Sequence, residues 1–184
     1  SHLMVESMRH AFADRARHLA DADFVDVPVD RLLNREKIEA AADRIQFDEI
    51  LATNSCGVIE GGAADVLKDE GTSHFSVIDD RGMTVACTQT INGTFGSLLA
   101  VPEIGVILNN EMNDFTTIPG ASNLFGLKQS DRNLPEPGKR PLSSMSPTIL
   151  LRDGQTAVTA GASGGPRIIT GTLQVLLEVI HGGK

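Results

Sequence analysis

The spacing of the apolar residues switches from a helical to a strand pattern near residue 71, and this change constrains the fold more than any other feature. Before it, apolar residues recur three and four positions apart, as in helices, over residues 3–19 and 34–45. After it they recur at every second position, as in strands, over residues 73–79 and 83–91. Helices followed by strands predict an α+β domain rather than a series of strand–helix–strand units.

The remaining segments complete this organisation. Residues 46–71 contain glycines and mixed charge without clear periodicity, which predicts a mobile connector. Residues 112–146 are rich in proline and predict a long loop region. Further predicted elements are a short strand at 105–108, a hairpin of strands 148–152 and 157–160, and a final helix from Pro166 to His181. The predicted core stripe of the first helix is Met4, Met8, Phe12 and Ala16.

The composition argues against several classes of protein. The chain has 184 residues and a formal net charge of −8, so it lacks the basic surface of nucleic-acid-binding proteins. No apolar run approaches the roughly 18 residues of a membrane-spanning helix, and no span is expected in this chain. The histidines lack metal-ligand spacing, and we expect no metal and no cofactor. Unpaired thiols are the favoured interpretation of Cys56 and Cys87, with a single disulfide as the alternative.

One segment matches a known nucleophile motif. Gly161-Ala162-Ser163-Gly164-Gly165 fits the GxSxG elbow of α/β-hydrolases, with a predicted strand before it and a helix after it. The rest of a catalytic triad does not fit, because His181, the only downstream histidine, lies about 27 Å away along the same helix. We therefore interpret the segment as a tight turn whose backbone N–H groups form an anion or oxyanion site.

The pair Gly71-Thr72 is a second candidate for nucleophilic chemistry. A threonine hydroxyl needs a base, and one solution is the threonine's own α-amine, exposed by cleavage of the preceding peptide bond. An α-amine has a pKa of about 7.7–8.0, so an appreciable fraction is unprotonated near neutral pH. Taken alone, a Gly-Thr pair before a strand is common, and an ordinary strand start is the favoured interpretation.

Several blocks of sequence favour the nucleophile interpretation of Thr72 over an ordinary strand start. They are Gly71-Thr72-Ser73-His74-Phe75-Ser76-Val77, Thr90-Ile91-Asn92-Gly93-Thr94-Phe95-Gly96, Leu108-Asn109-Asn110-Glu111-Met112-Asn113-Asp114-Phe115, Lys139-Arg140-Pro141-Leu142-Ser143-Ser144-Met145-Ser146-Pro147-Thr148, and Gly164-Gly165 followed by Arg167-Ile168-Ile169. In their order and spacing they resemble the gamma-glutamyltransferase (gamma-glutamyl transpeptidase) family. The helix around Met8 to Arg15 is also similar to the one that precedes the connector in that family.

The resemblance implies a fold and a processing event. The family has the N-terminal nucleophile hydrolase fold, an αββα sandwich, which would be incomplete in this chain. Its precursors cut themselves before a threonine, which becomes the first residue of the small subunit. Residues 1–71 would then be the C-terminal part of a large subunit, including the connector to the cleavage site, and residues 72–184 the N-terminal part of the small, catalytic subunit. Together they would form one fold unit. The chain would be a central fragment of a longer protein.

The resemblance also assigns roles to individual residues. Thr72 would be the nucleophile after autocleavage between Gly71 and Thr72, and Thr90 would orient it. The N–H groups of Gly164 and Gly165 would form the oxyanion hole. The residues implied to hold the α-amino and α-carboxylate end of a gamma-glutamyl group are Asn92, Glu111, Asp114, Ser143 and Ser144. The loop from about Pro119 to Asn133 resembles the lid over the pocket of some members, with Phe125 as its aromatic residue.

The implied substrates are glutathione or other gamma-glutamyl compounds, with water, an amino acid or a peptide as acceptor. The resemblance implies a periplasmic or extracellular location. It also implies partners, namely the remainder of the two subunits, including an arginine that holds the substrate carboxylate. Two alternatives stay open: a non-catalytic remnant of the family, and a related N-terminal nucleophile acylase that acts on another amide.

Overall fold

The computed structural model describes residues 1–52 and 71–182, which fall into two compact units. Unit 1 combines Ser1–Val66 with Met112–Leu142, and unit 2 combines Leu67–Glu111 with Ser143–Lys184. Most of the predicted connector, including Cys56, lies outside the described residues, whereas Cys87 is a half-buried free thiol. The units interleave along the chain, because each combines two separate segments.

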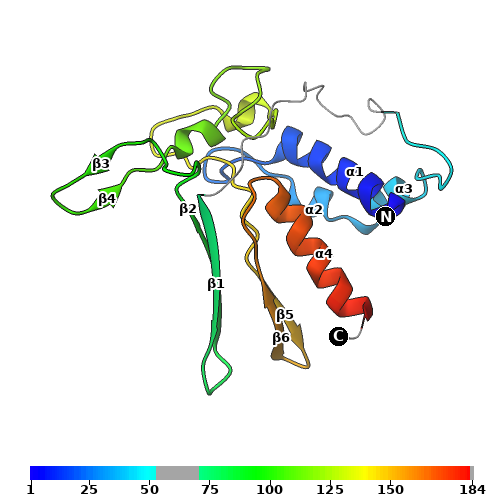
Figure 1. The fold of residues 1–184 in the computed structure, drawn as a ribbon. Coiled ribbons are helices and arrows are strands. Elements are labelled where there is room, and N and C mark those ends of the chain that lie inside the picture. The colour runs from blue at the N-terminus through cyan, green and yellow to red at the C-terminus, as the bar shows by residue number, and fades with distance from the viewer. Residues whose placement is uncertain (53–70, 183–184) are drawn as a thin grey trace. The chain divides into compact units, whose positions relative to one another are not determined.

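Unit 1 consists of helices followed by long loops (Figure 1). Its α-helices are α1 (His2–His18), α2 (Val29–Leu32) and α3 (Arg35–Ala42). Asn34 caps α3, because its side-chain Oδ1 accepts a hydrogen bond of 3.0 Å from the backbone N–H of Lys37. The predicted helix over 34–45 is thus found in shortened form, and α2 was not predicted.

The buried side of α1 differs from the predicted apolar stripe. Met4, Met8, Phe12 and Ala16 are only half-buried, whereas Glu6, Ala13 and Arg15 are buried. The Glu6 carboxylate accepts two hydrogen bonds of 2.9 Å from Nη1 of Arg9, which also donates to the carbonyl of Leu51. A buried charge is tolerated when it is paired in this way, so pairing rather than apolarity determines this face.

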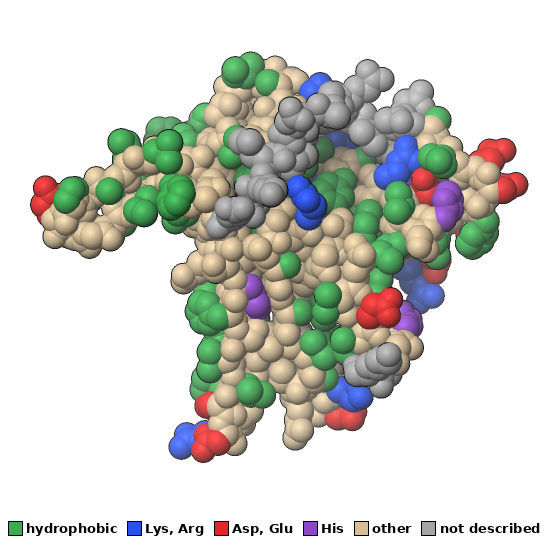
Figure 2. Space-filling view, in the orientation of Figure 1, with side chains coloured by type: hydrophobic (Ala, Val, Ile, Leu, Met, Phe, Trp, Pro, Cys, Tyr) green, Lys and Arg blue, Asp and Glu red, His purple; other side chains and the backbone are tan. Residues whose placement is uncertain are grey.

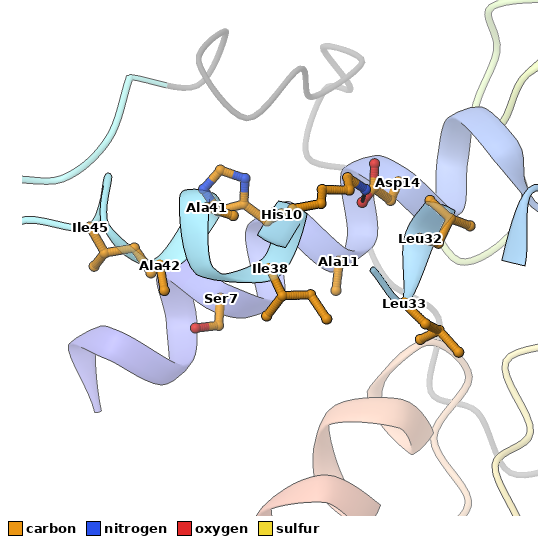
Figure 3. A pocket seen from close by; sticks show the side chains of 11 residues that line it. Ser7, His10, Ala11, Asp14, Leu32, Leu33, Ile38, Ala41, Ala42 and Ile45 are labelled. Atoms are coloured by element: carbon orange, nitrogen blue, oxygen red, sulfur yellow. Dashed lines mark hydrogen bonds and ion pairs between the residues drawn. The ribbon is translucent and has the colours of Figure 1, made fainter. Parts of the chain in front are cut away.

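A cavity of about 320 Å³ lies between α1 and the segment of α2 and α3 (Figure 3). Its walls are mainly apolar, and an ion pair between Lys37 and Asp14 lies at its edge. The apolar residues of the second predicted helix therefore face this cavity rather than a filled core. They are Ile38, Ala41, Ala42 and Ile45.

Unit 2 consists of three antiparallel hairpins and one long helix (Figure 1). The hairpins pair β1 (Thr72–Ile78) with β2 (Thr84–Thr90), β3 (Ala100–Val101) with β4 (Val106–Ile107), and β5 (Thr148–Arg152) with β6 (Gln155–Ala160). The helix α4 (Arg167–Gly182) packs against β6. Its last residue is Gly182, one residue beyond the predicted end at His181. The mixture of helices and small sheets agrees with the predicted α+β class.

Local chemistry explains two of the hairpin turns. The side-chain Oδ1 of Asp79 accepts hydrogen bonds from the backbone N–H groups of Arg81 and Met83, and Gly82 adopts a φ of 84°. Asp153 and Gly154 both have positive φ angles, of 53° and 78°. Two successive residues of this kind match the right-handed twist of the flanking strands. Both turns lie where the sequence predicts them.

Side-chain hydroxyl groups connect the first and third hairpins. Ser76 on β1 lies 3.0 Å from Thr159 on β6, and Thr84 on β2 lies 2.7 Å from Thr156 on β6, measured between hydroxyl oxygens. In the described residues each sheet has two strands, so these polar contacts take the place of a continuous hydrogen-bonded ladder. Exposed apolar side chains gather instead on β3 and β4 and along the first hairpin (Figure 2).

Candidate active site

Thr72 and Thr90 form the centre of the candidate site. They are the first residue of β1 and the last residue of β2, and they face each other in the antiparallel register. The Thr72 hydroxyl donates a hydrogen bond of 3.0 Å to Oγ1 of Thr90, which also accepts one of 2.8 Å from the backbone N–H of Asn92. The strand pairing thus fixes the direction of the Thr72 hydroxyl, as a nucleophile requires.

The turn after β2 is built around two asparagines. Asn92 is buried with a φ of 72°, a conformation that asparagine tolerates better than most residues. Its Nδ2 donates to the carbonyl of Asn110 at 3.0 Å, and Oδ1 of Asn110 accepts from the N–H of Gly93 at 2.9 Å. We did not predict the role of Asn110. The only sequence signal was an asparagine pair directly after a predicted strand.

Gly71, which precedes Thr72, can lie against this turn only because it lacks a side chain. A Cβ at residue 71 would lie 2.4 Å from the carbonyl oxygen of Gly93 and 2.6 Å from that of Asn92. Real Cβ atoms essentially never approach other atoms so closely. The carbonyl of Gly71 accepts a hydrogen bond of 3.2 Å from the N–H of Ile91. The residue before Thr72 is therefore held against the turn by its own backbone.

Gly164 and Gly165 lie in the turn that leads into α4. Their φ angles are 130° and 54°, in the region that favours glycine. Their carbonyl oxygens accept hydrogen bonds from the N–H groups of Arg167 and Ile168, at 3.1 and 3.0 Å. The turn is thus fixed to the start of a helix, where the helix dipole favours negative charge.

The other predicted residues of unit 2 lie near the ends of elements. The backbone N–H of Glu111 donates to Oδ1 of Asn109 at 2.9 Å, which places Glu111 directly after the Asn110 turn. Ser143 and Ser144 precede β5. Oγ of Ser143 accepts from the N–H of Met145 at 3.1 Å. The carbonyl of Ser144 accepts from a neighbouring serine hydroxyl.

Asp114 belongs to unit 1, where it ends a short 3-10 helix (Glu111–Asp114). Its carbonyl oxygen accepts hydrogen bonds from two buried amides, Nδ2 of Asn133 at 2.7 Å and Nε2 of Gln129 at 3.3 Å. Burial lowers the pKa of the Arg15 guanidinium, and the charge of Asp114 opposes that shift. Asp114 thus has a buried charged neighbour that the sequence did not reveal. Phe125, the predicted lid aromatic, is also buried.

Arg140 is engaged inside unit 1. Its Nε and Nη2 donate to the two carboxylate oxygens of the buried Asp21, at 3.0 and 2.6 Å, and its backbone N–H donates to Oδ2 at 2.8 Å. A second ion pair joins it to Asp23. These contacts hold the pKa of the Asp21 carboxyl well below its usual value, chiefly through the hydrogen bonds from the guanidinium.

This pair predicts a pH dependence of stability. Because the pKa of Asp21 is lower in the folded chain than in the unfolded one, the pair contributes fully above about pH 4 and less as the pH falls further. Asp21→Asn should therefore lower the melting temperature near neutral pH and flatten its decline at acidic pH. Thermal melts followed by circular dichroism would measure both effects. Asp30→Asn, at an exposed residue of α2, is the control and should behave as the parent does.

None of the helices in the described part of the chain is both long and apolar enough to cross a membrane.

Comparison with known sequences points to one protein family. A sequence model of the gamma-glutamyltranspeptidase family matches residues 1–184. The glutathione hydrolase proenzyme of Escherichia coli is 41% identical over 181 residues, which cover 98% of this chain and 31% of that protein. The chain thus spans about a third of the length of several curated relatives.

Two further comparisons bear on fold and activity. A mutant gamma-glutamyltranspeptidase from Helicobacter pylori has a solved structure that is 48% identical, with a TM-score of 0.59, over 60% of this chain and 60% of that one. This likeness supports the N-terminal nucleophile hydrolase fold in incomplete form. An Arabidopsis thaliana relative named as an inactive glutathione hydrolase is 42% identical over 164 residues, 88% of this chain and 84% of that protein.

Proposed function

The chain belongs to the gamma-glutamyltranspeptidase family, and we propose that it is the central segment of a proenzyme that hydrolyses or transfers gamma-glutamyl groups. The observation that carries the proposal is the hydrogen bond from Thr72 to Thr90 at the head of β1, directly after a glycine with no room for a side chain. Relatives named glutathione hydrolase proenzymes support glutathione-like compounds as substrates.

Self-cleavage is the first step of the proposed mechanism. Oγ1 of Thr72 attacks the carbonyl carbon of Gly71 and the peptide nitrogen takes up the hydroxyl proton. The C–N bond between residues 71 and 72 then breaks, which leaves the free α-amine of Thr72 and an ester between Gly71 and Oγ1. Water then hydrolyses the resulting ester, which separates residue 71 from residue 72. The hydrogen bond that the carbonyl of Gly71 accepts from Ile91 supports this step, because it polarises the bond that is attacked.

Gamma-glutamyl transfer uses the same hydroxyl. The α-amine of Thr72 takes the hydroxyl proton as Oγ1 attacks the gamma-carbonyl carbon, and the N–H groups of Gly164 and Gly165 hold the developing oxyanion. The departing amine takes up the proton. Water or an amine acceptor then attacks the ester on Thr72 and releases the gamma-glutamyl group.

The remaining predicted residues would bind the substrate. The carboxylates of Glu111 and Asp114 suit an α-ammonium group, and the hydroxyls of Ser143 and Ser144 suit an α-carboxylate. Asn92 would contact the same end of the substrate. One N–H of its Nδ2 donates to the carbonyl of Asn110, so this contact would involve the second N–H or Oδ1. The rest of both subunits would come from the remainder of the protein.

A second candidate is an inactive member of the family. The Arabidopsis thaliana relative named as inactive favours it, because this chain covers most of that short protein. One experiment separates the two functions. The full-length protein that carries this chain should appear as two subunits by intact-mass measurement and release the chromophore from a gamma-glutamyl anilide, but not from the matching α-glutamyl anilide. A protein that stays uncut and releases neither would support the inactive function.

A further inference from the structure

The imidazole of His74 lies between the first and third hairpins of unit 2. Its Nδ1 lies 2.8 Å from the hydroxyl of Thr88 on β2, and its Nε2 lies 3.0 Å from the hydroxyl of Ser76 on β1. Ser76 in turn contacts the hydroxyl of Thr159 on β6 at 3.0 Å. Both ring nitrogens therefore have partners, and the chain of contacts runs from the first hairpin to the third.

Gly161, the residue that follows β6, lies against the same ring, closest to Nδ1. A Cβ at residue 161 would lie 2.1 Å from Nδ1 of His74 and 2.4 Å from Cε1. Gly161 does not have a positive φ angle, so its backbone conformation is open to other residues. Close contact with the ring, rather than backbone strain, therefore accounts for glycine at this position.

The positions of these two residues connect the contact to the candidate site. His74 is two residues after Thr72 on the same strand, so their side chains share one face, about 7 Å apart along the strand. Gly161 is three residues before Gly164, where the turn into α4 begins. The ring thus lies between the strand that carries the proposed nucleophile and the segment that carries the proposed oxyanion donors.

We propose that His74 is a positioning residue that sets the separation between Thr72 and the Gly164–Gly165 turn by packing against Gly161. This inference rests on the proposed function. A ring with a hydrogen bond at each of its two nitrogens is a rigid spacer, and it fits against residue 161 only because that residue has no side chain. Moving either segment changes the distance from nucleophile to oxyanion donors, to which rate is steeply sensitive.

A double-variant cycle in the full-length protein tests the proposal. In Gly161→Ala the new methyl group would overlap the His74 ring, so the two segments must shift. This variant should lower kcat for a chromogenic gamma-glutamyl anilide by about 100-fold, with a much smaller change in KM. His74→Ala removes the spacer and should cause a smaller loss. In the double variant the methyl group occupies the space left by the ring, so kcat should rise above that of Gly161→Ala. For two residues in contact, the effect of one substitution typically changes by roughly 2- to 160-fold when the other substitution is also present.

Two further variants complete the design. Gly171→Ala, in α4 with open space around it and no positive φ, is the matched control and should retain the parent kcat. His74→Asn can keep a hydrogen bond to Thr88 and should recover part of the kcat lost in His74→Ala. Melting temperatures of all variants show whether kcat merely follows stability.

The possible results are distinguishable. Additive losses in the double variant of an active parent, or kcat changes that follow the melting temperatures alone, would overturn the positioning role of His74 and leave the proposed function intact. A parent that neither cuts itself nor releases the chromophore would overturn the proposed function, and the role of His74 with it.

Discussion

Replacing Thr72 with alanine should leave the full-length protein as one uncut, inactive chain. Alanine keeps the Cβ and the backbone pairing of residue 72 with Thr90, but it removes the oxygen proposed to attack the carbonyl of Gly71. Both proposed reactions need that oxygen, so self-cleavage and gamma-glutamyl transfer should be lost together. Intact-mass measurement should find two subunits in the parent and a single chain in the variant.

Two controls sharpen this experiment. Thr72→Ser keeps the hydroxyl and should still be cut, more slowly, because serine lacks the methyl group that restricts the side-chain rotamer. Ser73→Ala changes the neighbouring exposed residue and should be cut at the parent rate. If Thr72→Ala still yielded two fragments that join at residues 71 and 72, the assignment of the nucleophile would be wrong.

The hairpins and the last helix could be predicted from sequence because their signals are local. Alternating apolar residues predict strands at 73–79 and 83–91, whose ends lie within one residue of the ends of β1 and β2. Pro166 marks the start of α4 in the same way. By contrast, β3 has two residues, Ala100 and Val101, and so short a strand produces no periodicity. It forms because Val106 and Ile107 pair with it.

Burial of charge could not be predicted because it depends on partners far away in the sequence. Asp21 is buried against Arg140, which lies more than a hundred positions later in the chain. Glu6 is buried because Arg9 neutralises it and is itself held by the carbonyl of Leu51. The helical pattern of α1 therefore locates the helix correctly but places its buried face wrongly.

The candidate site likewise combines residues that could be assigned from the sequence with a contact that could not. Thr72 and Thr90 were assigned by resemblance. The strand register provides a physical reason for their pairing, since the first residue of β1 faces the last residue of β2. The contact of His74 with Gly161 joins two segments that no local pattern relates. A glycine without a positive φ has no turn signal, and its role becomes visible only when the neighbouring ring is in place.

Gly71→Ala should slow self-cleavage of the full-length protein by about 100-fold. The new methyl group would lie 2.4 and 2.6 Å from the carbonyl oxygens of Gly93 and Asn92, and both are backbone atoms that cannot rotate away. Either residue 71 or the turn must move by several tenths of an ångström or more. The first movement displaces the carbonyl that Thr72 is proposed to attack, and the second displaces Asn92, whose N–H holds Thr90.

The time course of cleavage, followed by intact mass after synthesis in a cell-free system, would measure this effect. Gly93→Ala is the matched control, because a Cβ there would lie at ordinary contact distances of 3.5 Å or more and the residue has no positive φ. It should be cut close to the parent rate, as should Gly171→Ala. Gly71 does not have a positive φ angle, so alanine is compatible with its backbone dihedral angles, and a thermal melt checks that the variant is folded. Cleavage of that folded variant at the parent rate would show that the close packing of residue 71 against the turn does not position the bond that is cut.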